Sequence, residues 1–255
     1  MKENLQSIAE TLDNAAKNAT PVPQVSLSQA IDLQDSYDIQ KQSINLRLGR
    51  DETLLGYKLG FTSKAKMEQM GVHEIIWGRL TNKMQYFHRG KLDRSHFIHP
   101  RIEPEIAFLV SKDIDRTLTM ENYAEYLDGV AGALEIIDSR YENFKFSLED
   151  VIADNCSSSG FVLGPWLDPN QTVQDLGIKL EINGEIVQEG NSKAILGNPI
   201  ESFLEMTRLA QKYGAKILKG HIILAGAATS AVYINSGDEI TGHFDQIGQV
   251  QISIV

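Results

Sequence analysis

The segment HPRIEPEIAFLV, residues 99–110, constrains the fold more than any other stretch, because it is apolar enough to cross a core and yet contains two glutamates. Alternate side chains of a β-strand point to the same face, so Arg101, Glu103 and Glu105 share one face and Ile106 points to the other. With a rise of about 3.3 Å per residue, the α-carbons of the two glutamates lie roughly 6 to 7 Å apart. This spacing lets both carboxylates bind one metal ion.

A third carboxylate can join this pair. Glu135 lies in GALEIID, an apolar segment that could pair with the first as a neighbouring strand. Three carboxylates without a thiolate or a clear histidine partner form a hard oxygen site, which suits Mg²⁺ or Mn²⁺ better than zinc. Its open positions could take a 2-oxo acid, whose carbonyl the metal would polarise. The residues leave another interpretation open, in which Glu103 and Glu105 lie on a solvated face of an edge strand, as Pro104 permits, and Glu135 pairs with a nearby arginine.

The rest of the sequence predicts an α+β fold. Residues 1–52 carry apolar side chains at helical spacing, with a break at ATPVPQ and with Ser28 as the candidate cap of the second stretch. Residues 53–255 consist mainly of short β-type segments that do not alternate regularly with helices, which disfavours a doubly wound nucleotide-binding sheet. We therefore expect a small helical N-terminal region, 1–52, and a β-rich, metal-binding catalytic domain, 53–255, with a mixed or antiparallel core.

Local patterns also predict helices and hairpins inside the β-rich part. A brief helix is expected over SKAKMEQMG, and another over SLEDVIADN, where Ser147 and Asp150 suit a helix start. The firmest helix is NPIESFLEMTRLAQKYG, with Asn198 as its cap, Pro199 in the first turn and Gly214 at its end. The tail, from residue 221 onward, alternates around the turns NSGD and DQIG as antiparallel strands do.

The composition excludes several classes of partner and site. Thirty-four acidic residues against 24 basic ones give a formal net charge of −10, which disfavours nucleic acids and anionic membranes. No signal peptide or membrane span is visible in the sequence, so a cytoplasmic location is expected. The single cysteine, Cys156, excludes an internal disulfide and a cysteine-only metal cluster, and we expect it to be a buried, inert thiol.

Several other polar residues have both a functional and a structural interpretation. Lys58, in GYKLGFTS, could donate a proton or stabilise an enolate, or it could be a surface lysine on a half-exposed strand. Arg140, Asn155 and Ser158 are candidates for binding a substrate carboxylate. The same three residues could equally serve turns and ordinary ion pairs.

Four segments, in order along nearly the whole chain, resemble the 2-oxo acid decarboxylase and hydratase group of the fumarylacetoacetate hydrolase superfamily. They are GYKLGFTSKAKMEQMGV, HPRIEPEIAF, ALEIIDSRYENFKF and VIADNCSSSGFVLG. The resemblance implies the fold of that superfamily and a divalent metal, usually Mg²⁺ or Mn²⁺, held by Glu103, Glu105 and Glu135. It also implies that Lys58, in the G-x-K-x-G segment, lies in the active site.

The resemblance also bears on the reaction. Hydratases of this group typically carry an aspartate in a P-D-x-G segment, and Ile76 stands at that position here, within HEIIWGRL. We therefore expect decarboxylation of 2-oxohex-3-enedioate (4-oxalocrotonate) to 2-hydroxypenta-2,4-dienoate, a step of aromatic catabolism by meta-cleavage, with Ile76 in an apolar wall beside the substrate.

Two alternatives stay open: a 2-hydroxypentadienoate hydratase and, from another class, a non-catalytic partner subunit that binds 2-oxo acids. Intact Glu103, Glu105, Glu135 and Lys58 argue against the non-catalytic subunit. The expected partners are a small 2-oxo dicarboxylic acid, a second copy of the chain in a homo-oligomer and, as a candidate, a companion hydratase.

Overall fold

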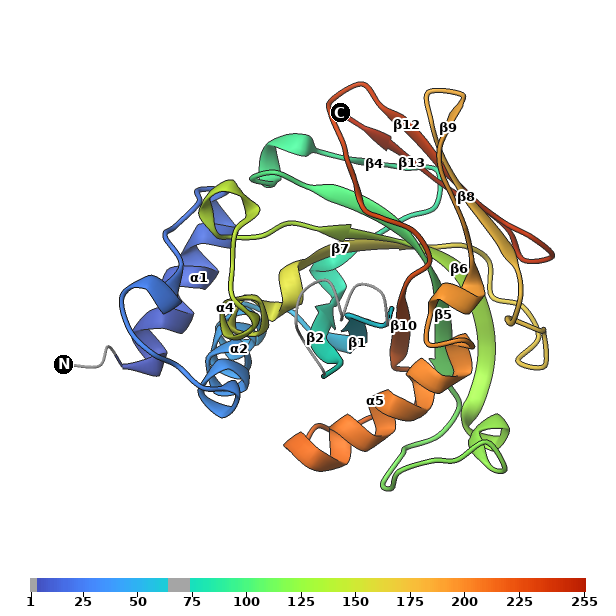
Figure 1. The fold of residues 1–255 in the computed structure, drawn as a ribbon, viewed down its shortest axis with the longest axis horizontal. Coiled ribbons are helices and arrows are strands. Elements are labelled where there is room, and N and C mark those ends of the chain that lie inside the picture. Colours follow the sequence, from blue (N-terminus) through green and yellow to red (C-terminus); the bar gives the residue numbers. More distant parts are fainter. Residues whose placement is uncertain (1–3, 64–73) are drawn as a thin grey trace.

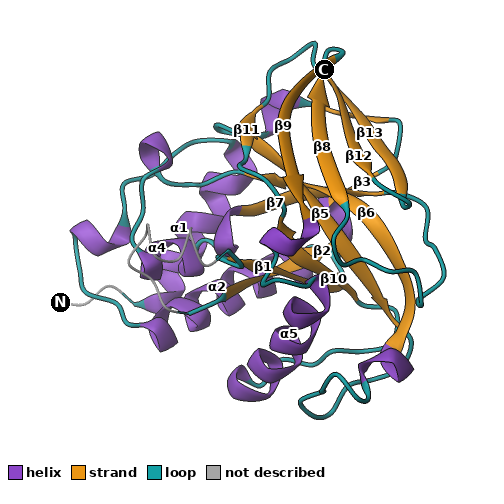
Figure 2. Ribbon diagram, turned by 45° about the vertical axis from the view of Figure 1, so that its right-hand side comes forward, coloured by secondary structure: helices purple, strands orange, loops and turns teal. Residues whose placement is uncertain are grey.

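Two β-sheets form the body of the molecule (Figures 1 and 2). The computed structural model describes residues 4–63 and 74–255, and all structural statements concern these residues. The helices in this part of the chain are α1 (Leu5–Asn18), α2 (Leu33–Leu48), α4 (Leu148–Ala153) and α5 (Pro199–Tyr213). The strands are β1 (Leu54–Gly60), β2 (Ile76–Thr81), β3 (Gln85–Tyr86), β4 (Gly90–Leu92), β5 (Arg101–Val110), β6 (Leu127–Ile137), β7 (Ser158–Leu163), β8 (Gly177–Ile182), β9 (Glu185–Asn191), β10 (Ile222–Ala227), β11 (Val232–Tyr233), β12 (Glu239–Phe244) and β13 (Gly248–Ile254).

The larger sheet has the strand order β2-β1-β10-β5-β6-β7-β3, and β11 pairs with the start of β5. The smaller sheet has the order β4-β13-β12-β8-β9. Most neighbours are antiparallel, but β1 with β10, β3 with β7 and β13 with β4 are parallel. The sheets are therefore mixed and mainly antiparallel, which confirms the predicted α+β class and the absence of a doubly wound order from the described strands.

The helices lie around the larger sheet (Figure 1). The N-terminal helices α1 and α2 lie together with α4 beside β1 and β2, and α5 packs near β10. Buried Gln40 of α2 donates through Nε2 to the carbonyl oxygens of Trp77 and Ile152, at 3.0 and 2.9 Å. Both bonds cross the expected boundary between residues 1–52 and 53–255. The division into these two parts stays a prediction.

The helix starts test the local predictions directly. Ser147 and Asp150 form the expected capping box of α4, and Asn198 accepts a hydrogen bond from Ile200 N at the start of α5. The prediction of Ser28 as a cap was wrong. The N-cap of α2 is Asp32, which forms a capping box with Asp35. The Ser28 hydroxyl donates to the carbonyl oxygen of Val25 instead. Two cap-type residues four apart compete here, and the one with a reciprocal acidic partner at the third helical position wins.

The predictions for the tail are confirmed in part, and the helix predicted over SKAKMEQMG lies mostly outside the described residues. Strands β12 and β13 pair as the predicted antiparallel hairpin around DQIG. The turn NSGD instead joins β11 of the larger sheet to β12 of the smaller one, so it connects two sheets rather than two paired strands. The helix predicted over SKAKMEQMG falls almost entirely on residues 64–73, outside the described residues. None of the helices in the described ranges is long and apolar enough to cross a membrane.

Strand β5 is an interior strand between β10 and β6 (Figure 1). On one face, Phe108 packs against Phe203 of α5 with tilted rings whose centroids are 5.6 Å apart, and Ile106 is fully buried. On the other face, Glu103 and Glu105 are also buried, with 8% and 0% of their surface exposed. The open alternative of a solvated edge strand is therefore wrong, since both neighbours of β5 are strands.

Pro104 is tolerated inside this sheet because the neighbouring strand is interrupted there. Strand β10 ends opposite Glu105, and β11 begins opposite Ile102. Between them Ala228 N donates to the carbonyl oxygen of Pro104 at 3.0 Å, while no ladder bond needs the N–H that proline lacks. The interruption between β10 and β11 thus lets a proline separate two buried glutamates without breaking the sheet.

Candidate active site

Three glutamates meet on one face of the β5–β6 pair. Glu103 lies directly opposite Glu135 in the antiparallel register, and Glu105 is two residues further along β5. One carboxylate oxygen from each of the three lies within 4.8 Å of the others, and all three side chains are buried. The prediction that Glu135 joins the pair from an adjacent strand is confirmed as a matter of position.

The hydrogen bonding of this triad is incomplete in a way that suits a cation. Gly226 N donates to Glu105 Oε2 at 2.8 Å, which fixes that carboxylate. Glu105 Oε1 and Glu135 Oε1 are buried and accept no hydrogen bond from the described residues. Buried carboxylate oxygens without donors are costly, and a cluster of one oxygen from each of the three glutamates is a donor set for a hard divalent metal. The triad can therefore hold Mg²⁺ or Mn²⁺.

Lys58 of β1 lies against the triad. Its Nζ is 3.0 Å from Glu135 Oε2 and donates to the carbonyl oxygen of Cys156 at 3.3 Å. The side chain is 3% exposed, which excludes the open alternative of a surface lysine. Gly56, two residues before Lys58, pairs with Ile222 of β10 so closely that a Cβ would come within 1.9 Å of the carbonyl oxygen of Ile222.

The electrostatics of the cluster are unusual because it is buried. Burial would lower the pKa of Lys58, but the adjacent carboxylates, Glu135 first, outweigh it and raise the pKa above its ordinary value. Burial raises the pKa of Glu105 well above its ordinary value, and the charges of Glu135 and Glu103 raise it further. Burial likewise raises the pKa of Glu135 to about 7, against the opposing effect of Lys58. The three carboxylates thus need more positive charge than one lysine provides.

A cavity of about 280 Å³ opens onto this cluster. Lys58, Glu103 and Ile76 line it, so Ile76 is placed beside the predicted metal site. Other lining residues, from several parts of the chain, are Gly60, Phe61, Thr62, Arg101, Phe144, Phe146, Cys156, Ser157 and Ser230. The cavity therefore combines an acidic and cationic floor with apolar and aromatic walls, as small-molecule sites do.

One wall is a turn of left-handed backbone. Asn155, Cys156 and Ser157 have φ angles of 50°, 52° and 57°, although none of them is glycine. Such residues cost roughly 1–2 kcal/mol each, so the surrounding structure must hold them in place. Asn155 does so by pairing with the backbone of Arg79: Nδ2 donates to its carbonyl oxygen and Oδ1 accepts from its N–H, at 2.9 and 2.7 Å.

The turn decides which groups face the cavity. The Cys156 carbonyl oxygen accepts from Lys58, and the Cys156 thiol donates to the carbonyl oxygen of Trp77 at 3.1 Å. Burial raises the pKa of Cys156 to about 12, which agrees with the expected buried, inert thiol. The Ser157 hydroxyl is buried, lines the cavity and has no hydrogen-bond partner among the described residues.

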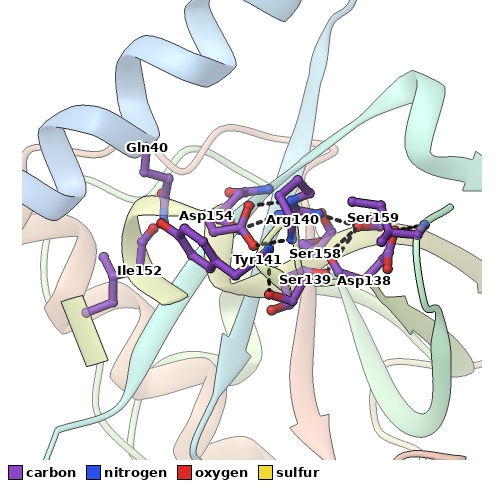
Figure 3. Close-up of polar contacts among 12 residues, drawn as sticks. Gln40, Asp138, Ser139, Arg140, Tyr141, Ile152, Asp154, Ser158 and Ser159 are labelled. Atoms are coloured by element: carbon purple, nitrogen blue, oxygen red, sulfur yellow. Dashed lines mark hydrogen bonds and ion pairs between the residues drawn. The ribbon is translucent and has the colours of Figure 1, made fainter. Parts of the chain in front are cut away.

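The structure does not bring Arg140, Asn155 and Ser158 to this cavity. All three line a second cavity of about 210 Å³ between the N-terminal helices and the sheet. Arg140 is buried and donates to Asp154 and to Ser159, as Figure 3 shows. Because its donors are used inside the protein, we infer that Arg140 is structural, as Asn155 is through Arg79. Ser157 lines the cavity that opens onto the triad, whereas Ser158 lines the second cavity.

Arg101 was missed as a site residue. The sequence placed it on the same face as Glu103 and Glu105, and it lines the same cavity. Its guanidinium carbon lies 4.1 Å from the ring centroid of Phe144 and 4.2 Å from that of Tyr233. The β-strand periodicity was the available signal, but the two aromatic partners come from distant parts of the chain.

Comparisons with known proteins identify the family. A family described as "Fumarylacetoacetate (FAA) hydrolase C-terminal" matches residues 87–255. A 4-oxalocrotonate decarboxylase from a Pseudomonas species is 43% identical over 98% of this chain and 97% of its own length. A 2-keto-4-pentenoate hydratase from Paraburkholderia phymatum is 31% identical over 86% of this chain and 84% of its own length.

A solved structure extends the similarity to three dimensions. The 4-oxalocrotonate decarboxylase from Pseudomonas putida G7, complexed with magnesium and adipate, superposes with a TM-score of 0.95 at 33% identity. The match covers 100% of this chain and 98% of that one. This chain therefore belongs to the fumarylacetoacetate hydrolase family, within the group that contains 4-oxalocrotonate decarboxylases and 2-keto-4-pentenoate hydratases.

Proposed function

We propose that this chain is a metal-dependent lyase that decarboxylates 2-oxohex-3-enedioate to 2-hydroxypenta-2,4-dienoate. The observation that carries the proposal is the buried triad of Glu103, Glu105 and Glu135 beside Lys58, at the floor of a cavity lined by Ile76. The relative that is 43% identical is named for this activity, and the P. putida G7 structure contains magnesium and the six-carbon dicarboxylate adipate.

The triad would hold the divalent cation through the carboxylate oxygens that face one another within 4.8 Å. When bound, Mg²⁺ or Mn²⁺ supplies Lewis acidity that polarises the carbonyl of a 2-oxo acid. The protein contributes geometry: two of the three ligands are fixed across one register of the β5–β6 ladder, and Glu105 is fixed by Gly226 N. A donor set on paired strands is rigid, which suits a site that must orient its substrate.

The reaction breaks the bond between C5 and C6 of the substrate and releases C6 as carbon dioxide. The electron pair moves through the conjugated C3–C4 double bond, and negative charge develops on the C2 oxygen. Lys58 stays protonated beside the triad and is placed to stabilise that charge and to give the oxygen a proton. A fixed cation at a developing oxyanion in a buried site contributes several kcal/mol, roughly 2.7–4 for a single donor.

Ser157 and Ile76 have complementary roles in this proposal. The buried Ser157 hydroxyl, without a partner among the described residues, is placed to donate to a substrate carboxylate oxygen. Ile76 offers no proton to a water molecule and keeps its part of the wall apolar, which favours loss of carbon dioxide over addition of water. The 31% identical hydratase makes hydration of 2-hydroxypenta-2,4-dienoate the second candidate.

A direct assay separates the two candidates. Purified protein with Mg²⁺ and 2-oxohex-3-enedioate should release carbon dioxide; EDTA should abolish the release, and added Mg²⁺ or Mn²⁺ should restore it. Ile76→Leu should retain activity, whereas Ile76→Asp places a carboxylate in an apolar wall and should lower decarboxylation at least about tenfold. Robust hydration without carbon dioxide release would reverse the order of the candidates, and metal-independent turnover would remove the mechanism.

The substrate and product of the proposed reaction indicate which partners to expect. The small ligand is a 2-oxo dicarboxylic acid, and the product, a 2-hydroxydienoate, is what a hydratase of the related group consumes. A companion hydratase and a homo-oligomer stay predictions, which size measurement of the protein alone and mixed with such a hydratase would test.

A further inference from the structure

Arg101 stands at the outer end of the row of charged residues on β5. Along one face of this strand the residues are Glu105, Glu103 and then Arg101, with successive α-carbons about 6.6 Å apart at the rise of a β-strand. Arg101 pairs in register with Ile137 on one side and with Tyr233 of β11 on the other. Because Tyr233 is 53% exposed, this end of the cavity is the one nearer to solvent.

The guanidinium of Arg101 is held between two aromatic rings. Phe144 and Tyr233 lie 4.1 and 4.2 Å from its central carbon, and the Nη2 atom donates to the Tyr233 hydroxyl at 2.6 Å. Aromatic faces on both sides exclude water from the faces of the cation and leave its edge as the direction for hydrogen bonds. The group is therefore oriented before any ligand arrives.

Most donors of this guanidinium are not used inside the described part of the protein. Arg101 Nε is buried without a hydrogen-bond partner, and no described carboxylate forms an ion pair with it. Arg140 provides the contrast within the same molecule, since its three nitrogens donate to Asp154, Ser158 and Ser159. Arg140 is buried and uses its donors inside the protein, whereas Arg101 is half-buried and leaves its Nε without a partner among the described residues.

We propose that Arg101 binds the distal carboxylate of a 2-oxo dicarboxylic acid whose 2-oxo acid end lies at the triad, and so selects dicarboxylates over monocarboxylates. The inference rests on the proposed function and adds its specificity residue. Lys58 and a divalent cation balance the charges of the three glutamates, so the inner end of the cavity needs no further cation. A planar guanidinium recognises a carboxylate through two parallel hydrogen bonds, and Arg101 lines the same cavity as Glu103 and Lys58.

The role predicts an effect on substrate binding rather than on the chemical step. The carboxylate held by Arg101 is the one that departs as uncharged carbon dioxide, so the ion pair weakens as the C5–C6 bond breaks. An interaction that is no stronger in the transition state than in the ground state does not raise kcat. Arg101→Met should therefore raise KM for 2-oxohex-3-enedioate about 10- to 100-fold without lowering kcat.

Binding of two unreactive ligands isolates this role from turnover. With Mg²⁺-loaded protein, calorimetry should show that Arg101→Met weakens binding of 2-oxoadipate about 10- to 100-fold and leaves binding of 2-oxohexanoate unchanged, because the two ligands differ only at the distal end. Arg101→Lys should give an intermediate loss, since it keeps the charge without the planar fork. Mn²⁺ affinity, measured by electron paramagnetic resonance without an organic ligand, should be the same in all variants.

The control is Arg116→Met, an exposed arginine paired only with its neighbour Asp115, which should bind both ligands like the wild type. Equal loss of both ligands in Arg101→Met, or unchanged binding of 2-oxoadipate, would overturn the proposal. Failure of the proposed function is distinguishable: a wild type that prefers 2-oxoadipate through Arg101 but releases no carbon dioxide would refute the decarboxylase and leave the selectivity intact.

Discussion

Glu105 and Glu135 are costly to ionise in the absence of a cation. Burial raises the pKa of Glu105, and the facing charges of Glu135 and Glu103 raise it further, so ionising this carboxyl group in the metal-free protein costs free energy. Lys58 compensates for one of these charges at 3.0 Å. The arrangement lowers the stability of the metal-free fold, and it provides a binding site that is assembled before the metal binds.

Glu105→Gln tests whether this side chain destabilises the metal-free fold and binds the metal. The amide can still accept the hydrogen bond from Gly226 and cannot ionise beside Glu103 and Glu135, so the metal-free variant should unfold at a higher temperature than the metal-free wild type. Its affinity for Mg²⁺ should fall roughly 100-fold or more, because even groups beyond the ligands are worth 10- to 100-fold. Turnover should be abolished at ordinary Mg²⁺ concentrations.

Thermal unfolding with and without Mg²⁺ provides the measurement. At a Mg²⁺ concentration 100 times the Kd, the wild type should gain about 2.7 kcal/mol of stability, and Glu105→Gln should gain almost none at the same concentration. The exposed Glu201→Gln variant on α5 is the matched control and should behave like the wild type. An unchanged Mg²⁺-dependent shift in Glu105→Gln would contradict the assignment of this side chain as a ligand.

At the scale of elements, the left-handed turn at residues 155–157 and strand β2 depend on each other. Gly78 of β2 lies so close to the turn that a Cβ would come within 2.5 Å of the carbonyl oxygen of Asn155. The glycine thus permits the contact through which Asn155 grips the backbone of Arg79. The positions of the Cys156 carbonyl group and the Ser157 hydroxyl follow from it.

Gly78→Ala should displace the turn and reduce catalysis more than it reduces stability. We expect a stability loss of about 1–3 kcal/mol from overpacking and a fall in kcat of about 100-fold, the scale of an ångström-sized misplacement. Mn²⁺ affinity should be unchanged, because the triad lies on β5 and β6. Gly49→Ala, where a Cβ would meet nothing closer than 3.4 Å, is the control. Loss of Mn²⁺ binding in Gly78→Ala would show that the damage is not confined to the turn.

The triad could be predicted because short segments of sequence are enough to identify its members. Two glutamates stand at the spacing of one strand face, and the third stands in another apolar segment. The sequence could not predict that Ser157 lines this cavity, because no glycine marks the three consecutive left-handed residues of the turn. Arg101 was missed for a related reason, since Phe144 and Tyr233 reach it only through tertiary packing. The pattern of apolar residues could not predict the sheet order either. The caps of α4 and α5 could be predicted, because capping depends on residues a few positions apart.

At the scale of the whole molecule, Asp150 joins the N-terminal region to the catalytic part. It lies on α4 and accepts hydrogen bonds from Ser147 N, from Ser26 N and Oγ, and from Gln24 Nε2. Burial acts to raise its pKa, but these hydrogen bonds outweigh it and lower the pKa below 3.8. One carboxylate thus serves as a helix cap and as the anchor of the segment between α1 and α2.

Asp150→Asn should destabilise the whole molecule in a pH-dependent way. Because the folded-state pKa is lowered, the unfolded chain binds more protons near pH 3.8, so the contribution of this carboxylate is complete above that pH and is lost as pH falls through the folded-state value. Urea unfolding at pH 7 should show a loss of about 1–3 kcal/mol, which shrinks as the pH is lowered below 3.8. Exposed Asp115→Asn should show no such difference, and a pH-independent loss in Asp150→Asn would contradict the carboxylate's role.

The pairing of Glu103 with Glu135 in one ladder has an evolutionary consequence. The connection at residues 111–126 can gain or lose residues across generations without touching the ligands, because strand pairing alone sets their separation. A single inserted or deleted codon inside β5 or β6 instead turns a glutamate toward the opposite side of the sheet and removes it from the cluster. Length variation among descendants of this chain should therefore concentrate in that connection and be absent from the two strands.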